Sequence, residues 1–254
     1  MNRMRAGAIA LLLTAGTGLA VTGMMSPASA ASTPAPTPAP VVTTVSPVES
    51  FVTHAYYDLV NRPADAGGKA YWVGQVNAGK SHASVASAMI GTNDYRTRVV
   101  ADAYLATLGR YVDPGGLQFW TGYLANGGHL EQLTGSLVGS SEYASGFGTN
   151  YDAYVKAVYQ TLLGRGTDPA GQAYWVGRLS AGDPMWHVAA SVSHSYEWYR
   201  NEVVFDFVHY HNGFPDGQGL GYWAQSLQSG MNDSTLVATL VGSPTYASWA
   251  ATHP

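Results

Sequence analysis

The chain has 254 residues, no cysteine and a formal net charge of −4, from 12 Lys and Arg residues against 16 Asp and Glu residues. The lack of cysteine excludes disulfides, thiolate zinc sites and a lipid anchor on a thiol. The basic residues are few and scattered, so we expect neither nucleic acid nor an anionic membrane surface as a partner.

Residues 1–30 have the pattern of a secretory signal peptide. Arg3 and Arg5 precede an apolar stretch that ends near Met25, and small residues at 28–30 offer a cleavage site after Ala30. A membrane anchor is the alternative reading of this stretch, but its glycines and threonines dilute the hydrophobicity. We therefore expect a secreted protein, extracellular or associated with the cell surface, with no membrane span after cleavage.

Residues 31–50 are rich in Pro, Ala, Thr, Ser and Val and carry almost no charge. This composition favours extended, polyproline-like chain over a packed core. We interpret the segment as a tether between the signal peptide and the rest of the protein.

The remainder of the chain contains four copies of one sequence unit, which we place at residues 51–98, 99–150, 151–201 and 202–254. In each copy an Asp is followed three residues later by a Gly and seven residues later by a Trp, and an aromatic residue precedes the Trp. The copies of these three markers are Asp65, Gly68 and Trp72; Asp113, Gly116 and Trp120; Asp168, Gly171 and Trp175; and Asp216, Gly219 and Trp223. Recurrence at a fixed period is typical of repeat architectures.

The third copy shows what one unit builds. Asp168 followed by Pro169 is a strong helix start, and Gly182 is placed to end that helix after about twelve residues. Asp183 is expected to cap a second helix. A Ser or Thr followed by an acid and an aromatic, as in residues 140–143 and 195–198, predicts the cap of a third, longer helix that runs into the next Asp loop.

These patterns predict an all-α fold, a tandem array of four three-helix repeats of roughly fifty residues. The spacing between successive tryptophans is 48, 55 and 48 residues. The seven extra residues fall around 145–150, so we expect two pairs of copies, the first with the second and the third with the fourth, with a looser joint between them. The fourth copy is degenerate, and we expect it to cap the array.

The run from Leu163 to Trp175, together with Ser-Ser-Glu-Tyr at 140–143, resembles the bacterial domain-of-unknown-function family 4214. The second and third copies fit the pattern best. The first copy opens differently at Asn61, and the fourth lacks the Arg before its Asp. The resemblance implies an all-helical module of exported, surface-associated bacterial proteins and brings no catalytic residues with it.

The repeated tryptophans and their aromatic neighbours could stack against sugars, but a large apolar residue recurring at one helical position is more simply core, and we favour that interpretation. The aromatics outside the repeat register are better candidates for a ligand face. They are Trp186, Tyr199, Tyr210 and Trp249.

The Asp loops are possible calcium sites. Calcium takes six to eight oxygen ligands, and each loop offers one Asp that is already needed as a helix cap, so we expect no metal or other cofactor here. Arg62, Arg110 and Arg165 stand three residues before these acids and are expected to pair with them or to cap the preceding helix.

The fourth copy carries Glu202, Asp206 and His209 where the other copies have mostly apolar residues. These side chains share one helix face, so two carboxylates and an imidazole could serve a metal or acid–base catalysis. The alternative, which we favour, is that the last repeat needs a polar outer face.

No nucleophile elbow, phosphate loop or zincin helix is present in the sequence. We expect a non-enzymatic module that binds an extracellular protein or polysaccharide. A hydrolase of glycan or peptide acting through the Glu202, Asp206 and His209 face is one alternative, and a structural spacer or surface-layer component is another. The sequence does not indicate an oligomeric state.

Overall fold

The computed structural model describes residues 45–253, and every regular element in that range is an α-helix. The all-α prediction is therefore confirmed. No helix in this range is both long enough and apolar enough to cross a membrane. The proposed signal peptide and most of the proposed tether lie outside the described residues. The helices are α1 (Pro47–Val60), α2 (Ala66–Asn77), α3 (His82–Ile90), α4 (Asn93–Leu108), α5 (Pro114–Ala125), α6 (Leu130–Val138), α7 (Ser141–Ser145), α8 (Tyr151–Leu163), α9 (Pro169–Ser180), α10 (Trp186–Ser193), α11 (Tyr196–His211), α12 (Gly217–Gln228), α13 (Asp233–Val241) and α14 (Pro244–Thr252).

The helices form four successive sets of a long helix, an Asp-capped helix and a shorter helix. The Asp-capped helices α2, α5, α9 and α12 each have twelve residues. In each, the carboxylate of the preceding Asp accepts a hydrogen bond from the main-chain N–H of the Gly three residues on, at 2.7–2.9 Å. This bond satisfies one of the free amides of the first turn, as the sequence predicts.

Two of the predicted domain boundaries fall inside helices. The boundaries at residues 98 and 201 cut α4 and α11, because the copies were aligned on their tryptophans and not on the Ser and Thr caps that begin the long helices. The tether also ends earlier than predicted. Ser46 and Glu49 form a capping box that starts α1 at Pro47, so residues 47–50 are helical.

The third set differs from the others in two places. Its long helix is broken into α7 and α8, and the seven extra residues lie at this break. Asp183 does not cap the next helix as predicted. Its carboxylate is instead bound by Arg178 Nε at 2.5 Å, and α10 begins only at Trp186.

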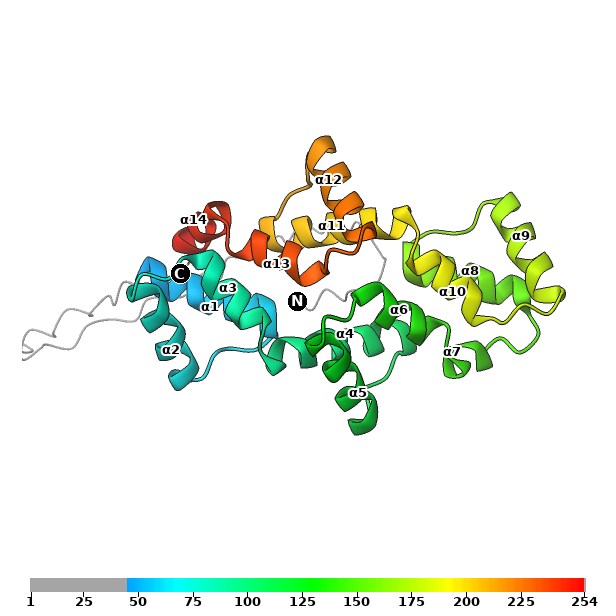
Figure 1. Cartoon of the computed structure of the whole chain (residues 1–254), viewed down its shortest axis with the longest axis horizontal. Helices are drawn as coiled ribbons and strands as arrows, with labels where there is room; N and C mark the ends of the chain where they lie inside the picture. The colour runs from blue at the N-terminus through cyan, green and yellow to red at the C-terminus, as the bar shows by residue number, and fades with distance from the viewer. Residues whose placement is uncertain (1–44, 254) are drawn as a thin grey trace, which may run out of the picture.

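The array folds back on itself, and this arrangement corrects the predicted pairing of copies. The chain runs along one side of the molecule through α4 and α6, turns through α8–α10 at the far end and returns through α11 and α13 (Figure 1). As a result α6 packs against α10, α3 against α13 and α1 against α14. The second set is therefore paired with the third and the first with the fourth, so the fourth set does not cap an open end.

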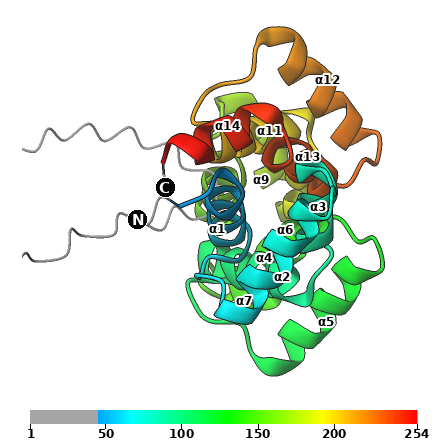
Figure 2. The same ribbon diagram turned by 90° about the vertical axis from the view of Figure 1, so that its left-hand side faces the viewer.

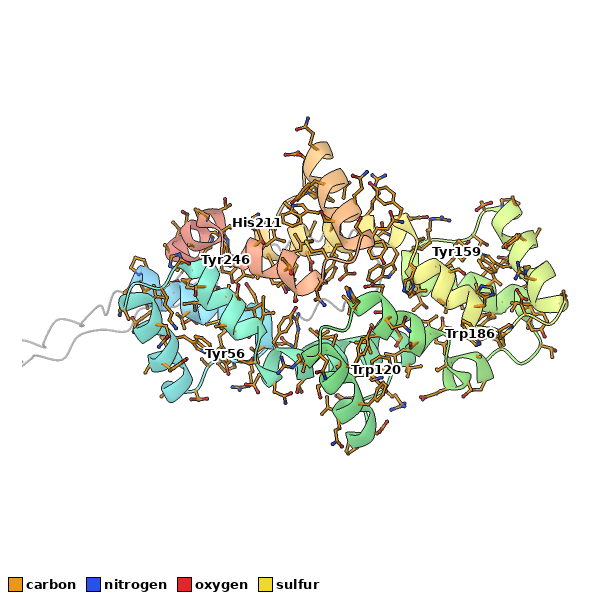
Figure 3. The ribbon with its side chains drawn as sticks, viewed as in Figure 1. Tyr56, Trp120, Tyr159, Trp186, His211 and Tyr246 are labelled. Carbon is orange, nitrogen blue, oxygen red and sulfur yellow. The ribbon has the colours of Figure 1, made fainter. Side chains whose placement is uncertain are left out.

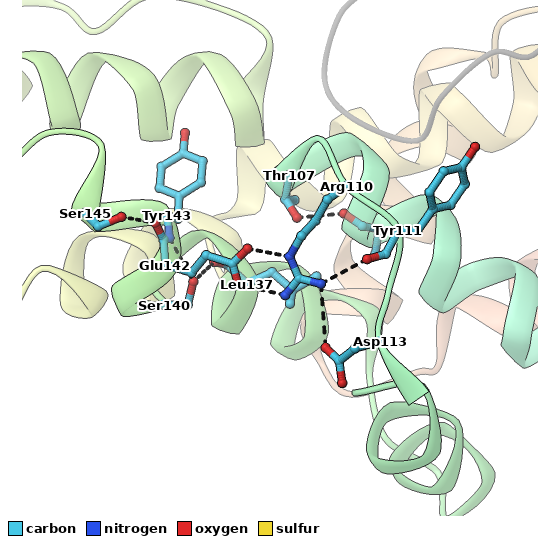
Figure 4. Close-up of polar contacts among 10 residues, drawn as sticks. Thr107, Arg110, Tyr111, Asp113, Leu137, Ser140, Glu142, Tyr143 and Ser145 are labelled. Atoms are coloured by element: carbon cyan, nitrogen blue, oxygen red, sulfur yellow. Dashed lines mark hydrogen bonds and ion pairs between the residues drawn. The ribbon is translucent and has the colours of Figure 1, made fainter. Parts of the chain in front are cut away.

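Successive sets are tied by an arginine that reaches the first turn of a later helix. Arg110 donates to both carboxylate oxygens of Glu142, at 2.5 and 2.7 Å (Figure 4), and Arg165 does the same to Glu197. Arg62 donates to one carboxylate oxygen of Asp94, at 2.5 Å. The expected partner, the capping Asp, is a weaker second contact, 3.6 Å away in the case of Arg110.

The fourth copy lacks both members of this pair. Gly213 stands at the position of the arginine and Thr245 at the position of the acid. The simultaneous loss of both charges leaves no unpaired member behind, and His211 Nε2 lies 3.1 Å from Ser243 Oγ near the same place. The pairs are thus structural links between sets.

A candidate aromatic binding surface and a buried acidic cluster

The four repeated tryptophans are half-buried and pack against the hydrophobic core, which supports the predicted core role without full burial. The aromatic residue before each Trp is the exposed partner. Tyr71, Phe119, Tyr174 and Tyr222 are 54–65% exposed. Each lies edge-on to its Trp, with ring centroids 4.8–5.1 Å apart. The structure therefore presents one supported aromatic ring per set.

Three of these rings are followed one turn later by a glycine in the middle of the helix, at Gly74, Gly122 and Gly177. A Cβ built at any of the three would meet nothing within 4 Å, so packing does not require glycine there. Glycine in a helix interior costs roughly 0.5–1 kcal/mol relative to alanine. The same loss of helix stability recurs in three copies, and packing does not explain it. We infer that glycine keeps the helix surface beside each exposed ring free of side chains.

The helices that carry these rings project from the body of the molecule. In Figure 1, α2 and α5 extend on one side and α12 on the opposite side, and Figure 2 shows α5 and α12 at the periphery as well. The rings are therefore spread over several projections and do not form one continuous apolar patch.

The aromatic residues outside the repeat register divide into two groups. Trp186 is 57% exposed and Trp249 is 37% exposed, but α10 and α14 lie at opposite ends of the molecule (Figures 1 and 3). Tyr199 and Tyr210 are buried, and Tyr210 lines the same small cavity as Trp249. Burial raises the pKa of the Tyr199 hydroxyl to about 12. The four residues do not form a common binding face.

The structure brings together two of the three residues proposed for catalysis. Glu202 and Asp206 on α11 meet Asp233 at the start of α13, with one carboxylate oxygen from each within 4.8 Å of the others. Asp206 has no exposed surface. The acidic residues therefore lie between helices of the fourth set, and the predicted polar outer face of a terminal repeat is wrong for Asp206.

His209 lines a small cavity of about 80 Å³ between α1, α11 and α14. Asp58, Tyr246 and Trp249 also line this cavity. Asp58 accepts a hydrogen bond from the Tyr246 hydroxyl at 2.5 Å, and burial raises the pKa of the Asp58 carboxyl. The imidazole of His209 thus lies where α11 meets the first and last helices.

Carboxylate oxygens are the ligands that calcium prefers, and with one oxygen from each acid the cluster would supply three of the six to eight that the ion takes. In the Asp loops, one oxygen of each carboxylate is already used by the Gly amide of the cap. The calcium prediction stays a prediction.

Sequence reasoning missed the exposed rings and the third acid for different reasons. The rings stand next to the tryptophans in every copy, and the mid-helix glycine after three of them is a signal that could have separated them from the core. Asp233 is far from Asp206 in sequence, and no local pattern indicates that α13 packs on α11.

The arrangement of Asp-capped helices, supporting arginines and Ser or Thr caps is the pattern on which the family resemblance was based. Residues 45–99 and 134–201 match the family described as "Domain of unknown function (DUF4214)". The comparisons with curated proteins and with solved structures gave no match. Residues 45–99 and 134–201 of the chain thus belong to the DUF4214 family.

Proposed function

We propose that this protein is a secreted, non-enzymatic module of the cell envelope that binds polysaccharide through the exposed rings of Tyr71, Phe119, Tyr174 and Tyr222. The observation that supports the proposal is the presence of one exposed ring, supported by a half-buried Trp, at the same position of all four sets. The apolar C–H groups of a sugar ring pack on the electron-rich face of such an aromatic ring.

The separation of the rings favours a polysaccharide over a protein partner. A protein interface usually has a contiguous core from which water is excluded, whereas these rings stand on different projecting helices. A polymer with a repeating sugar can occupy several separate rings at once. Each additional ring then binds within the same complex, which raises the overall affinity.

The two alternative functions have less support. A hydrolase acting through Glu202 and Asp206 needs a substrate to reach these carboxylates, and Asp206 has no exposed surface. A spacer or surface-layer role does not explain why an exposed aromatic ring, supported by a Trp, recurs in all four sets. The signal-peptide pattern and the proline-rich segment support secretion and attachment near the cell envelope.

The test is co-sedimentation of the full mature protein with insoluble cell-wall polysaccharide. We expect retention of the wild type and loss of retention when Tyr71, Phe119, Tyr174 and Tyr222 are all changed to Ala. The matched control changes Tyr57 and Phe214 to Ala, because both are exposed aromatics outside the repeated position. Equal retention of the quadruple variant and the control would refute the proposal, as would a wild type that stays in the supernatant.

A further inference from the structure

An open hollow of about 480 Å³ lies at the end of α5, where the chain passes into α6. This volume falls within the range of roughly 300–1,000 Å³ that is common for small-molecule sites. The hollow includes one of the four exposed rings, that of Phe119. Its lining residues are Phe119, Tyr123, Asn126, Gly127, Gly128 and His129.

Most of this lining is specific to the second copy. The position of Tyr123 is occupied by Gln75, Arg178 and Ser226 in the other copies. His129 corresponds to a Ser, a Pro and an Asn, and Gly128 to a Lys, an Asp and a Met. Residues shared by all copies build the fold, so departures that meet around one hollow indicate a role particular to this copy.

The hollow is held in shape by contacts among these same residues. The Tyr123 ring lies edge-on to Trp120, with centroids 5.5 Å apart, and its hydroxyl accepts the main-chain N–H of His129 at 3.1 Å. A Cβ at Gly128 would overlap the Tyr123 ring, so only glycine allows the loop to lie against it. Preformed geometry of this kind lowers the entropy lost on binding.

Two further hydrogen bonds fix the polar groups of the loop. Asn126 Nδ2 donates to the Gly122 carbonyl at 2.8 Å, which orients the side-chain amide. From the fourth set, Asn232 Nδ2 donates to the Gly128 carbonyl at 2.9 Å. The loop is thus braced by a segment about one hundred residues away, and its shape depends on the folded-back arrangement of the sets.

The lining offers aromatic surface, an amide and an imidazole, and it contains no Lys, Arg, Asp or Glu. Glu131, outside the lining, has its Oε1 3.6 Å from His129 Nδ1. A flat apolar surface beside a few oriented polar groups suits a ligand with one apolar face and hydroxyls around its edge. A neutral sugar ring has this chemistry.

We propose that the hollow at the end of α5 is the main sugar-binding subsite of the protein and takes one neutral pyranose ring. The sugar stacks on Phe119, and its hydroxyls bond to Asn126 and His129. This inference rests on the proposed polysaccharide-binding function and adds to it that the second set dominates, while the rings of the other sets extend contact with a longer polymer.

The test is affinity gel electrophoresis of the full mature protein in gels containing neutral glucan, mannan or arabinogalactan, with polygalacturonate as the charged comparison. Phe119→Ala and Asn126→Ala are each expected to weaken binding to the preferred neutral polymer about tenfold or more, as for a residue that dominates an interface. Tyr174→Ala, the same position in a set without the hollow, is expected to change binding by no more than about twofold.

Phe119→Tyr keeps the ring and is expected to retain binding, which separates stacking from any structural role of Phe119. If the wild type binds and Phe119→Ala loses no more affinity than Tyr174→Ala, the subsite is wrong while the proposed function stands. Stronger binding to polygalacturonate than to every neutral polymer would also overturn the subsite. A wild type that is retarded by none of the polymers would overturn both proposals.

Discussion

At the scale of single residues, side-chain hydrogen bonds join the first helix, α1, to the last helix, α14. Ser50 Oγ donates to the Ala250 carbonyl at 2.5 Å, and both residues are buried. Beside them, Tyr246 donates to the Asp58 carboxylate, whose other neighbours include His54 on α1 and Arg98 on α4. A titratable carboxyl is therefore partly buried where α14 packs against α1.

The raised pKa of Asp58 predicts how the free energy of unfolding depends on pH. Burial raises this pKa above its ordinary value of about 3.9, despite the opposing effects of Tyr246, His54 and Arg98. The folded state thus favours the protonated carboxyl. The contribution of this protonation is fully present below the unfolded pKa and is lost as the pH rises through the folded pKa.

The Asp58→Asn variant cannot ionise here, and its amide oxygen can still accept from Tyr246. We expect the free energy of unfolding of the wild type, relative to this variant, to fall between pH 4 and pH 8 in urea denaturation. The surface carboxyls whose pKa values are lowered by caps or arginines, such as Asp113 and Glu142, are common to both proteins and cancel in the difference. A difference that stays constant with pH would contradict the burial argument.

What the sequence could predict at this scale was local. The repeated Asp caps and the Ser caps were foreseen because cap and amide stand three residues apart, and the structure places them as predicted, whereas Asp183 does not cap its helix. The burial of Tyr199 and Tyr210 could not be foreseen, because it depends on helices that pack from elsewhere in the chain. The arginine partners were missed for the same reason, since Glu142 lies 32 residues beyond Arg110.

At the scale of the helix, glycine has two opposite roles in this fold. Gly242 ends α13 where a Cβ would collide with the backbone of Ala83 in α3, so its small size allows the first and fourth sets to meet. Gly177 stands in the middle of α9 with nothing within 4 Å of its Cβ position. Neither has a positive φ, so alanine fits the backbone at both positions.

The same substitution should therefore have opposite effects at the two sites. Gly177→Ala is expected to stabilise the protein by roughly 0.5–1 kcal/mol through helix propensity. Gly242→Ala is expected to destabilise it by about 1–3 kcal/mol through overpacking against α3. Chemical denaturation of both variants tests this. Destabilisation by Gly177→Ala would show that an unrecognised contact fills the space beside the Tyr174 ring.

At the scale of the whole molecule, the four sets do not form an open stack. The array folds back so that the first set packs against the fourth and the second against the third. The packing of α6 against α10 is repeated where α13 packs against α3. In the first case Gly139 lies against Trp186, and in the second Gly242 lies against Ala83, at the corresponding positions of their sets. One interface type therefore holds both pairs of sets together.

The sequence predicted the unit and the helix content, but not this closure. Fold-back is decided by which third helices meet, and neither Gly139 nor Gly242 differs from an ordinary helix-ending glycine in the sequence. The same limit applies to the candidate site, because the hollow at α5 is braced by Asn232 from the fourth set. The glycine one turn after three of the exposed rings is visible in the repeated sequence. The shape of the hollow could not be predicted from the sequence.

The closure of the first set on the fourth is the central structural claim, and a distance measurement tests it most directly. Because the chain has no cysteine, spin labels can be placed at Thr53→Cys on α1 and Ser248→Cys on α14, both exposed positions, without other changes. Packed helices lie about 8–10 Å apart, so pulsed electron spin resonance should give a single narrow distribution centred below about 30 Å once the label arms are included. A broad distribution, or one centred at about twice that distance, would show that the repeats form an open array and would contradict the fold-back.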